Sequence, residues 1–277
     1  SFMKLSALSK AGIGIVVWGA FVFMRVPDLL AEAWAHALLL FAALVLVPLA
    51  LELFAETDES GPAPRLLGVA RALQLSAAVF LAISCALAPG PLAAAASLPW
   101  VLWTGLLAAI GGLRLRRGGL RRSLDGMCAD AALMFAAIGG AWTLADRLGY
   151  SPLGFSRDIV ALTAVHFHYA GLLLPLFAGL VQRELWFLRF ASRAAVGVVL
   201  GVPAVAFGIT TTRLGWGTSI EAAAGVGLAI AGMAVAVLHV RIALETKRDG
   251  VTRALLGVAG ASLFFGMVLA ALYATRA

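Results

Sequence analysis

Two histidines and a tyrosine lie inside one long apolar segment. This segment covers residues 158–182 and contains His166, His168 and Tyr169. A charged group at the centre of a membrane helix costs about 2.5 kcal/mol or more, so ionisable residues at that depth usually mark a functional site. An imidazole, with an ordinary pKa of about 6.5, takes up and releases protons near neutral pH. The three residues therefore predict acid–base chemistry inside a membrane.

Other acids and bases could exchange protons with these histidines. Asp158 begins the same segment, and Glu32 and His36 lie four residues apart, on one face of a different helix. Positioned carboxylates and imidazoles act as general acids and bases. The predicted catalytic residues are His166, His168, Tyr169, Glu32, His36 and Asp158.

A metal site is a weaker interpretation of the same residues. Residues two positions apart on a helix are rotated by about 200° about its axis, so His166 and His168 point to opposite sides. Glu32, His36 and one of these two histidines could hold a metal, and a haem could lie between His36 and one of them. The tight spacing of a His-Glu-x-x-His helix is missing in both cases. We expect no metal and no cofactor. In a purely structural alternative, one histidine bonds a helix carbonyl or Thr163 and the other reaches a neighbouring helix or Tyr169.

A second polar group lies late in the chain. Three threonines end at Thr212, Arg213 follows, and glycines flank Trp216. Such a turn could bring backbone donors and an arginine fork to an anionic head group. The alternative is a loop arginine beside an interfacial tryptophan. The predicted substrate-binding residues are Thr163, Thr212, Arg213 and Trp216.

The composition defines the class of protein. The chain is 62% hydrophobic and 13% charged, with a mean hydropathy of +0.99. A soluble domain would need more charge to cover its surface. Apolar segments near 20 residues long are typical of membrane helices. They predict an all-α, polytopic transmembrane helical bundle that forms one integral membrane domain over residues 1–277, with spans at about 11–26, 34–54, 66–88, 92–113, 127–147, 158–182, 194–212, 220–244 and 252–274.

Charge predicts the orientation of these spans. Fifteen lysines and arginines fall on one side and five on the other, which favours a cytoplasmic N-terminus and an external C-terminus. The net charge of +7 then reflects topology rather than nucleic-acid binding. The first segment, 11–26, is the weakest and could be a tilted span or an interfacial helix. We expect no cleaved signal peptide, because no Ala-x-Ala site follows that segment.

Some side chains within the spans have expected structural roles. Asp130 is expected to pair with Arg71 or with a loop arginine. Pro48, Pro175 and Pro203 should kink their helices, because proline lacks a backbone donor. The tryptophans are expected at the membrane interfaces.

One short motif resembles a known family. Residues 163–171, Thr-Ala-Val-His-Phe-His-Tyr-Ala-Gly, with Pro175 after them, are similar to the signature of YndJ-like bacterial membrane proteins. The resemblance implies the bacterial inner membrane and points to His166, His168 and Tyr169. It implies no particular reaction, because the family is described as uncharacterised or loosely as transporter-like.

Three functions fit these observations. The first is a membrane-embedded enzyme that applies histidine acid–base chemistry to a lipid or isoprenoid-like substrate in a pocket open to the outer side. The second is a proton-coupled secondary transporter, although no two related halves are visible. The third is a structural protein, which would leave the buried His-x-His unexplained. The expected partners are the lipid bilayer and a hydrophobic small molecule.

Overall fold

The computed structural model describes residues 5–25, 33–54, 62–119, 122–245 and 249–275. These residues are helical, with no strand among them, and they include nine helices long and apolar enough to cross a membrane. The predicted all-α transmembrane class is confirmed. The inside-to-outside orientation stays a prediction.

The described chain divides into two compact units, the first built from Ser1–Arg121 and Ala132–Leu173, the second from Arg122–Ala131 and Leu174–Ala277. The α-helices that precede Leu174 are α1 (Ala7–Met24), α2 (Trp34–Phe41), α3 (Val47–Leu53), α4 (Pro62–Ala86), α5 (Pro91–Gly118), α6 (Leu124–Leu148) and α7 (Arg157–His166). All of them belong to the first unit except the start of α6, which belongs to the second. Two π-helical segments, η3 (Ala42–Leu46) and η6 (Phe167–Leu173), continue α2 and α7, and a 3-10 turn, η5 (Pro152–Gly154), precedes α7.

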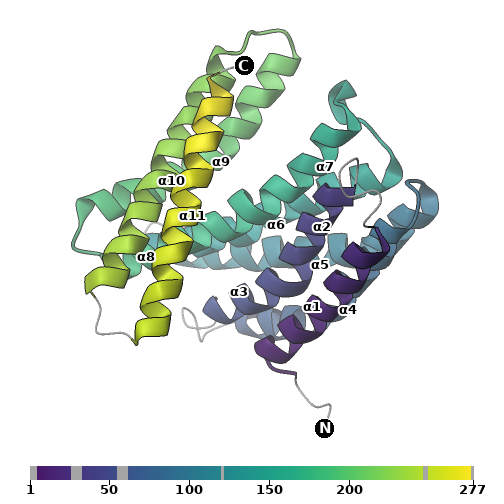
Figure 1. Cartoon of the computed structure of the whole chain (residues 1–277), viewed down its shortest axis with the longest axis horizontal. Helices are drawn as coiled ribbons and strands as arrows, with labels where there is room; N and C mark the ends of the chain where they lie inside the picture. Colours follow the sequence, from purple (N-terminus) through teal and green to yellow (C-terminus); the bar gives the residue numbers. More distant parts are fainter. Residues whose placement is uncertain (1–4, 26–32, 55–61, 120–121, 246–248, 276–277) are drawn as a thin grey trace. The chain divides into compact units, whose positions relative to one another are not determined.

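The second unit holds α8 (Leu174–Glu184), α9 (Arg189–Arg213), α10 (Ser219–Glu245) and α11 (Gly250–Ala274). In Figure 1, α10 runs beside both α9 and α11, and it packs against each of them. Glycines allow the close approach. A Cβ on Gly208 of α9 would lie 2.6 Å from the Cα of Glu221, and one on Gly260 of α11 would lie 2.8 Å from the Ala236 carbonyl oxygen of α10. Small residues of this kind favour packing between membrane helices.

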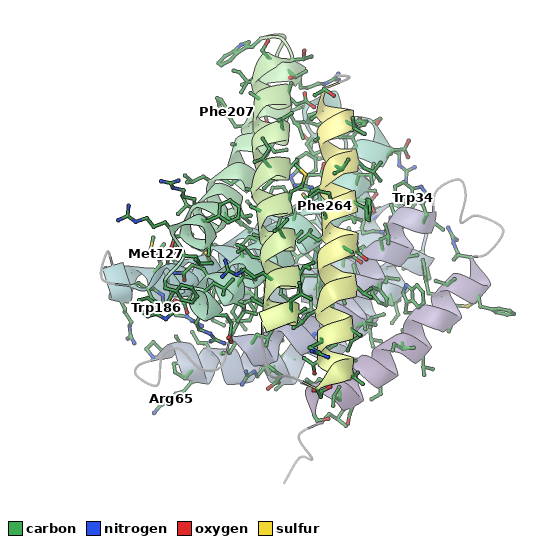
Figure 2. The ribbon with its side chains drawn as sticks, turned by 60° about the vertical axis from the view of Figure 1, so that its left-hand side comes forward. Trp34, Arg65, Met127, Trp186, Phe207 and Phe264 are labelled. Carbon is green, nitrogen blue, oxygen red and sulfur yellow. The ribbon has the colours of Figure 1, made fainter. Side chains whose placement is uncertain are left out.

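Large apolar side chains remain exposed on the second unit. Phe207 of α9, Phe264 of α11 and Trp186 between α8 and α9 are labelled in Figure 2, and each is more than one third exposed. A hydrocarbon solvent stabilises such surfaces as well as a protein core does. These faces suit contact with lipid.

Asp130 and Arg122 form a buried ion pair within the second unit. Arg122 lies just before α6 and Asp130 within its first two turns. The expectation that Asp130 pairs with a loop arginine is therefore confirmed.

Helix 34–53 is the most buried span of the first unit, and side chains from its neighbours bond its backbone. Trp18 of α1 donates to the Ala37 carbonyl at 2.8 Å, and Gln74 of α4 donates to the Ala43 carbonyl at 2.7 Å. Arg71 and Arg114 donate to carbonyls in and just after the last turn. Cations there complement the helix dipole.

A proline follows each π-helical segment by two residues. Proline lacks an N–H and clashes with the carbonyl four residues earlier, which is Leu44 for Pro48 and Gly171 for Pro175. Both of these residues lie inside the π-helical segments. Widening of the helix relieves the clash at these two prolines. Pro203, by contrast, lies inside α9 without a π-helical segment, so a proline alone does not produce one.

The two π-helical segments also pack against each other. Gly14 of α1 lies so close to the Leu44 carbonyl that no Cβ would fit there. Tyr169 of η6 donates its hydroxyl to the Leu38 carbonyl at 3.0 Å. The Tyr169 bond and the packing of α2 against α7 hold the start of helix 34–53, which carries His36, beside α7.

Candidate acid–base site

His36, Asp146 and Arg147 form a buried polar cluster in the first unit. Nε2 of His36 lies 2.8 Å from Oδ2 of Asp146, and Nη1 of Arg147 lies 3.2 Å from that nitrogen and 3.3 Å from the carboxylate oxygen. The side chains of His36, Asp146 and Arg147 are 13%, 5% and 1% exposed. Buried charges in proteins are paired in this way because an unpaired one would be costly.

The ends of three helices position this cluster. His36 lies in the first turn of α2, and Asp146 and Arg147 lie in the last turn of α6. Arg147 donates through Nη2 to the Leu87 carbonyl just after α4, at 2.7 Å, and its own carbonyl accepts from the Gly90 amide at 2.8 Å. The arginine therefore joins α6 to the turn between α4 and α5.

Asp146 orients the His36 ring through one nitrogen only. Within the described residues, no group is hydrogen-bonded to the other nitrogen, Nδ1. A carboxylate that holds one nitrogen of an imidazole leaves the second to act as a base. The cluster can therefore accept a proton at Nδ1 of His36.

His168 is fully buried, and both of its ring nitrogens are occupied. Trp100 donates to Nε2 at 3.0 Å, and Nδ1 lies 2.7 Å from the Ala164 carbonyl oxygen. Because an indole only donates and a carbonyl only accepts, these partners assign the proton to Nδ1. A Cβ on Gly139 would lie 2.9 Å from the ring, so α6 packs directly on it. This geometry suits a neutral, structural imidazole.

His166 has a different environment from His168. Its Nε2 is buried and has no hydrogen-bond partner among the described residues. The ring meets Phe167 edge-on, with centroids 5.7 Å apart. A buried nitrogen without a partner is uncommon in proteins and calls for an explanation. His166 is therefore the member of the His-x-His pair that is free to bind a ligand or transfer a proton.

Asp158 and Tyr169, two further predicted catalytic residues, are not part of the His36 cluster. Glu32 lies outside the described residues. Asp158 is exposed in the first turn of α7, and Tyr169 donates to a backbone carbonyl. Among the described residues, no three histidine, cysteine, aspartate or glutamate side chains are grouped closely enough to hold a metal, so His36, His166 and His168 form no such group.

The predicted substrate-binding residues make local contacts. Thr163 donates to the Ile159 carbonyl in its own helix, at 2.6 Å. Thr212 donates to the Gly217 carbonyl at 3.1 Å, and Trp216 is exposed. Thr212, Arg213 and Trp216 belong to the second unit. Their binding role stays a prediction.

The sequence analysis did not identify two side chains that bond to site residues, Trp100 to His168 and Arg147 to Asp146. Trp100 and Trp103, which we expected to be interfacial residues, are buried within the protein and stacked, with centroids 4.7 Å apart. Their spacing of three on a helix places both on one face, which is the signal that was available. Charge counting treats Arg147 only as an external cation, whereas it lies in the last turn of α6 and pairs with the adjacent Asp146.

Comparisons with known proteins find one family. A family model described as YndJ-like protein matches residues 37–276. A curated relative, the uncharacterized membrane protein YndJ of Bacillus subtilis (strain 168), is 32% identical over 118 residues, which are 42% of this chain and 21% of the relative. The matched part therefore spans about one fifth of that relative's length. No solved structure matches.

Proposed function

The chain belongs to the YndJ-like family of membrane proteins, and we propose that it is a membrane-embedded enzyme which applies acid–base chemistry to a lipophilic substrate. The substrate would be a lipid or an isoprenoid-like molecule that enters from the bilayer. We place the protein in the bacterial inner membrane. Isomerisation, cyclisation and hydrolysis each need only positioned acids and bases.

The His36–Asp146–Arg147 cluster is the observation that carries this proposal. Asp146 holds Nε2 of His36 at 2.8 Å, which leaves Nδ1 as the base. Arg147 balances the charge of the carboxylate, so the site stays neutral while the histidine is neutral. The three side chains are at most 13% exposed, and a low dielectric strengthens the electrostatic interactions of a positioned base.

His166 is the second proton-transferring group in this proposal. The helix that carries it, α7, packs against α2, which carries His36. Its unpartnered Nε2 would hydrogen-bond the polar end of the substrate or return the proton. In this scheme His168 and Tyr169 hold the helices in place through Trp100 and the Leu38 carbonyl.

A comparison of membrane lipids tests the proposal even though the substrate is unidentified. The intact chain and its His36→Gln variant are produced at equal levels in a bacterial host, and the lipid extracts are profiled by mass spectrometry. We expect a species that accumulates only with the intact chain. His239→Gln is the matched control, because His239 lies in the second unit and bonds the Val235 carbonyl of its own helix. Identical profiles for all three would contradict the proposal.

Proton-coupled transport is the second candidate, and the π-helical segments favour it. Carriers often use interrupted helices near the membrane centre. Here two interrupted spans touch, one at η3 and one at η6. Purified protein in vesicles that hold a pH-sensitive dye distinguishes the candidates. A carrier would move protons into the vesicles when its substrate is supplied, and an enzyme would not.

A further inference from the structure

We propose that Thr163, His166 and Tyr169 bind the hydroxyl group of an uncharged lipid alcohol. The three residues lie along one side of α7 and η6, and two of them can offer a ligand only acceptor oxygens. This inference rests on the proposed function and names the chemical class of its lipophilic substrate.

The three polar side chains are close together along a single span. Thr163 and His166 are three positions apart on α7, and Tyr169 follows three positions later in η6. Residues at this spacing are neighbours on the surface of a helix. All three residues are partly exposed, whereas His168 is fully buried. This side of the span is therefore the one that a ligand can approach.

Hydrogen bonds within the protein determine what Thr163 and Tyr169 can offer to a ligand. The Thr163 hydroxyl lies 2.6 Å from the Ile159 carbonyl oxygen, and the Tyr169 hydroxyl lies 3.0 Å from the Leu38 carbonyl oxygen. A carbonyl only accepts, so these bonds use the hydrogen of each hydroxyl. Lone pairs remain on both oxygens. Toward a ligand the two side chains are therefore acceptors, and they favour a group that donates.

His166 can bond such a group in either direction. Its buried Nε2 has no hydrogen-bond partner among the described residues. A neutral imidazole has one donor nitrogen and one acceptor nitrogen. A hydroxyl group both donates and accepts, so it matches one imidazole beside two acceptor oxygens. An ionised carboxylate has no hydrogen to donate to Thr163 or Tyr169.

The charges around this span favour an uncharged ligand. No Lys, Arg, Asp or Glu occurs between Asp158 and Arg183 in the sequence, and α2 and η3, which pack against α7 and η6, contain none. Asp146 and Arg147 of α6 are paired with each other. A bound phosphate would lack a cation and a bound ammonium would lack an anion. An unpaired charge away from water is costly, and a hydroxyl group avoids that cost.

Competition among lipids that share one hydrocarbon chain tests this preference. The full chain in detergent is labelled with hexadecanol that carries a photoreactive diazirine beside its hydroxyl end, and mass spectrometry locates the labelled peptide. We expect the label within residues 158–182. Unlabelled hexadecanol should compete about three- to tenfold better than hexadecanoic acid, hexadecyl phosphate or hexadecyl methyl ether. The ether keeps the oxygen but has no hydrogen to donate.

A matched pair of threonine variants tests the acceptor role. Thr163→Val keeps the shape of the side chain but removes its oxygen, so labelling should weaken about three- to tenfold. Thr210→Val is the control, because Thr210 makes the same kind of bond, to the Ala206 carbonyl, in the second unit. An equal loss of labelling in both variants would contradict the proposed role of Thr163.

The competition in the intact chain is sufficient even if a variant does not fold. Equal competition by the methyl ether, stronger competition by the acid or the phosphate, or a label confined to other helices contradicts the inference. The proposed enzyme would stand after such a result if the lipid product still depended on His36. A preference for the alcohol, together with identical lipid profiles for the intact chain and His36→Gln, would support the alcohol site and contradict the enzyme.

Discussion

Oδ2 of Asp146 lies 2.8 Å from Nε2 of His36, although 110 positions separate the two residues in the chain. Asp146 belongs to the last turn of α6 and His36 to the first turn of α2. Asp146 is buried and His36 largely so, and Arg147 contacts both side chains. This contact places an oriented base among membrane-spanning helices.

Loss of the carboxylate should destabilise the protein. Asp146→Asn keeps the size of the side chain but leaves Arg147 as a buried charge without its counter-ion. Removal of one partner from a buried ion pair costs about 3–5 kcal/mol. Thermal unfolding in detergent should therefore begin at a clearly lower temperature, while Asp158→Asn, at an exposed site, should unfold like the intact chain. Equal unfolding temperatures for all three would mean that the ion pair is not formed.

The close approach of α1 to helix 34–53 predicts that alanine substitutions at two nearby glycines of α1 have very different effects on stability. A Cβ on Gly14 would collide with the Leu44 carbonyl, whereas one on Gly12 would meet nothing within 4 Å. Gly14→Ala should lose about 1–3 kcal/mol through strain. Gly12→Ala should be neutral or slightly stabilising, because alanine favours helix. Chemical unfolding of both variants measures the difference, and equal behaviour would refute the contact.

His168 should depend on Trp100 for its stability. Trp100→Phe keeps an aromatic ring but removes the donor to Nε2, which leaves a buried acceptor unpaired. We expect a loss of about 1–3 kcal/mol. Trp186→Phe is the control, since Trp186 is 74% exposed. An unfolding free energy unchanged by Trp100→Phe would show that the hydrogen bond is not made.

The start of α11 should be sensitive to acid. Asp249 accepts from the backbone amide of Thr252 at 2.9 Å and from its hydroxyl at 2.7 Å, and these bonds lower the pKa of the carboxyl. The ionised cap is therefore retained above the ordinary aspartate pKa, and its contribution is lost as the pH falls through the lowered value. The protection of amides in the first turn of α11, measured relative to unstructured amides at the same pH, should fall below about pH 4. In Asp249→Ala this protection should be low at every pH, and a loss of protection below about pH 4 in that variant would rule out the cap.

Much of the architecture could be predicted from the sequence because a helix that crosses a bilayer needs about 20 mostly apolar residues. Each of the nine predicted apolar segments coincides with a helix long enough to span a membrane. Pro48 and Pro175 indicated disturbed helices. The form of the disturbance, two π-helical segments in contact, depends on how the helices pack, and packing is not encoded in any single segment.

The candidate site was only partly predictable for the same reason. His166 and His168 are identifiable as ionisable groups at a costly depth, and His36 as a possible partner in proton exchange, and that reasoning is local. The pairing of His36 with Asp146, and the occupation of both nitrogens of His168, arise from contacts between distant segments. Trp100 in particular resembles an interfacial residue, and its spacing of three from Trp103 indicates a shared face but not the partner, His168.

A comparison of the His36→Gln, Asp146→Asn and combined variants tests the central claim most directly. The amount of the lipid product is measured by mass spectrometry in membranes that contain equal quantities of folded protein. If the two residues act as one acid–base unit, each single variant should lose about as much product as the double variant. Wild-type product in either single variant would contradict the account.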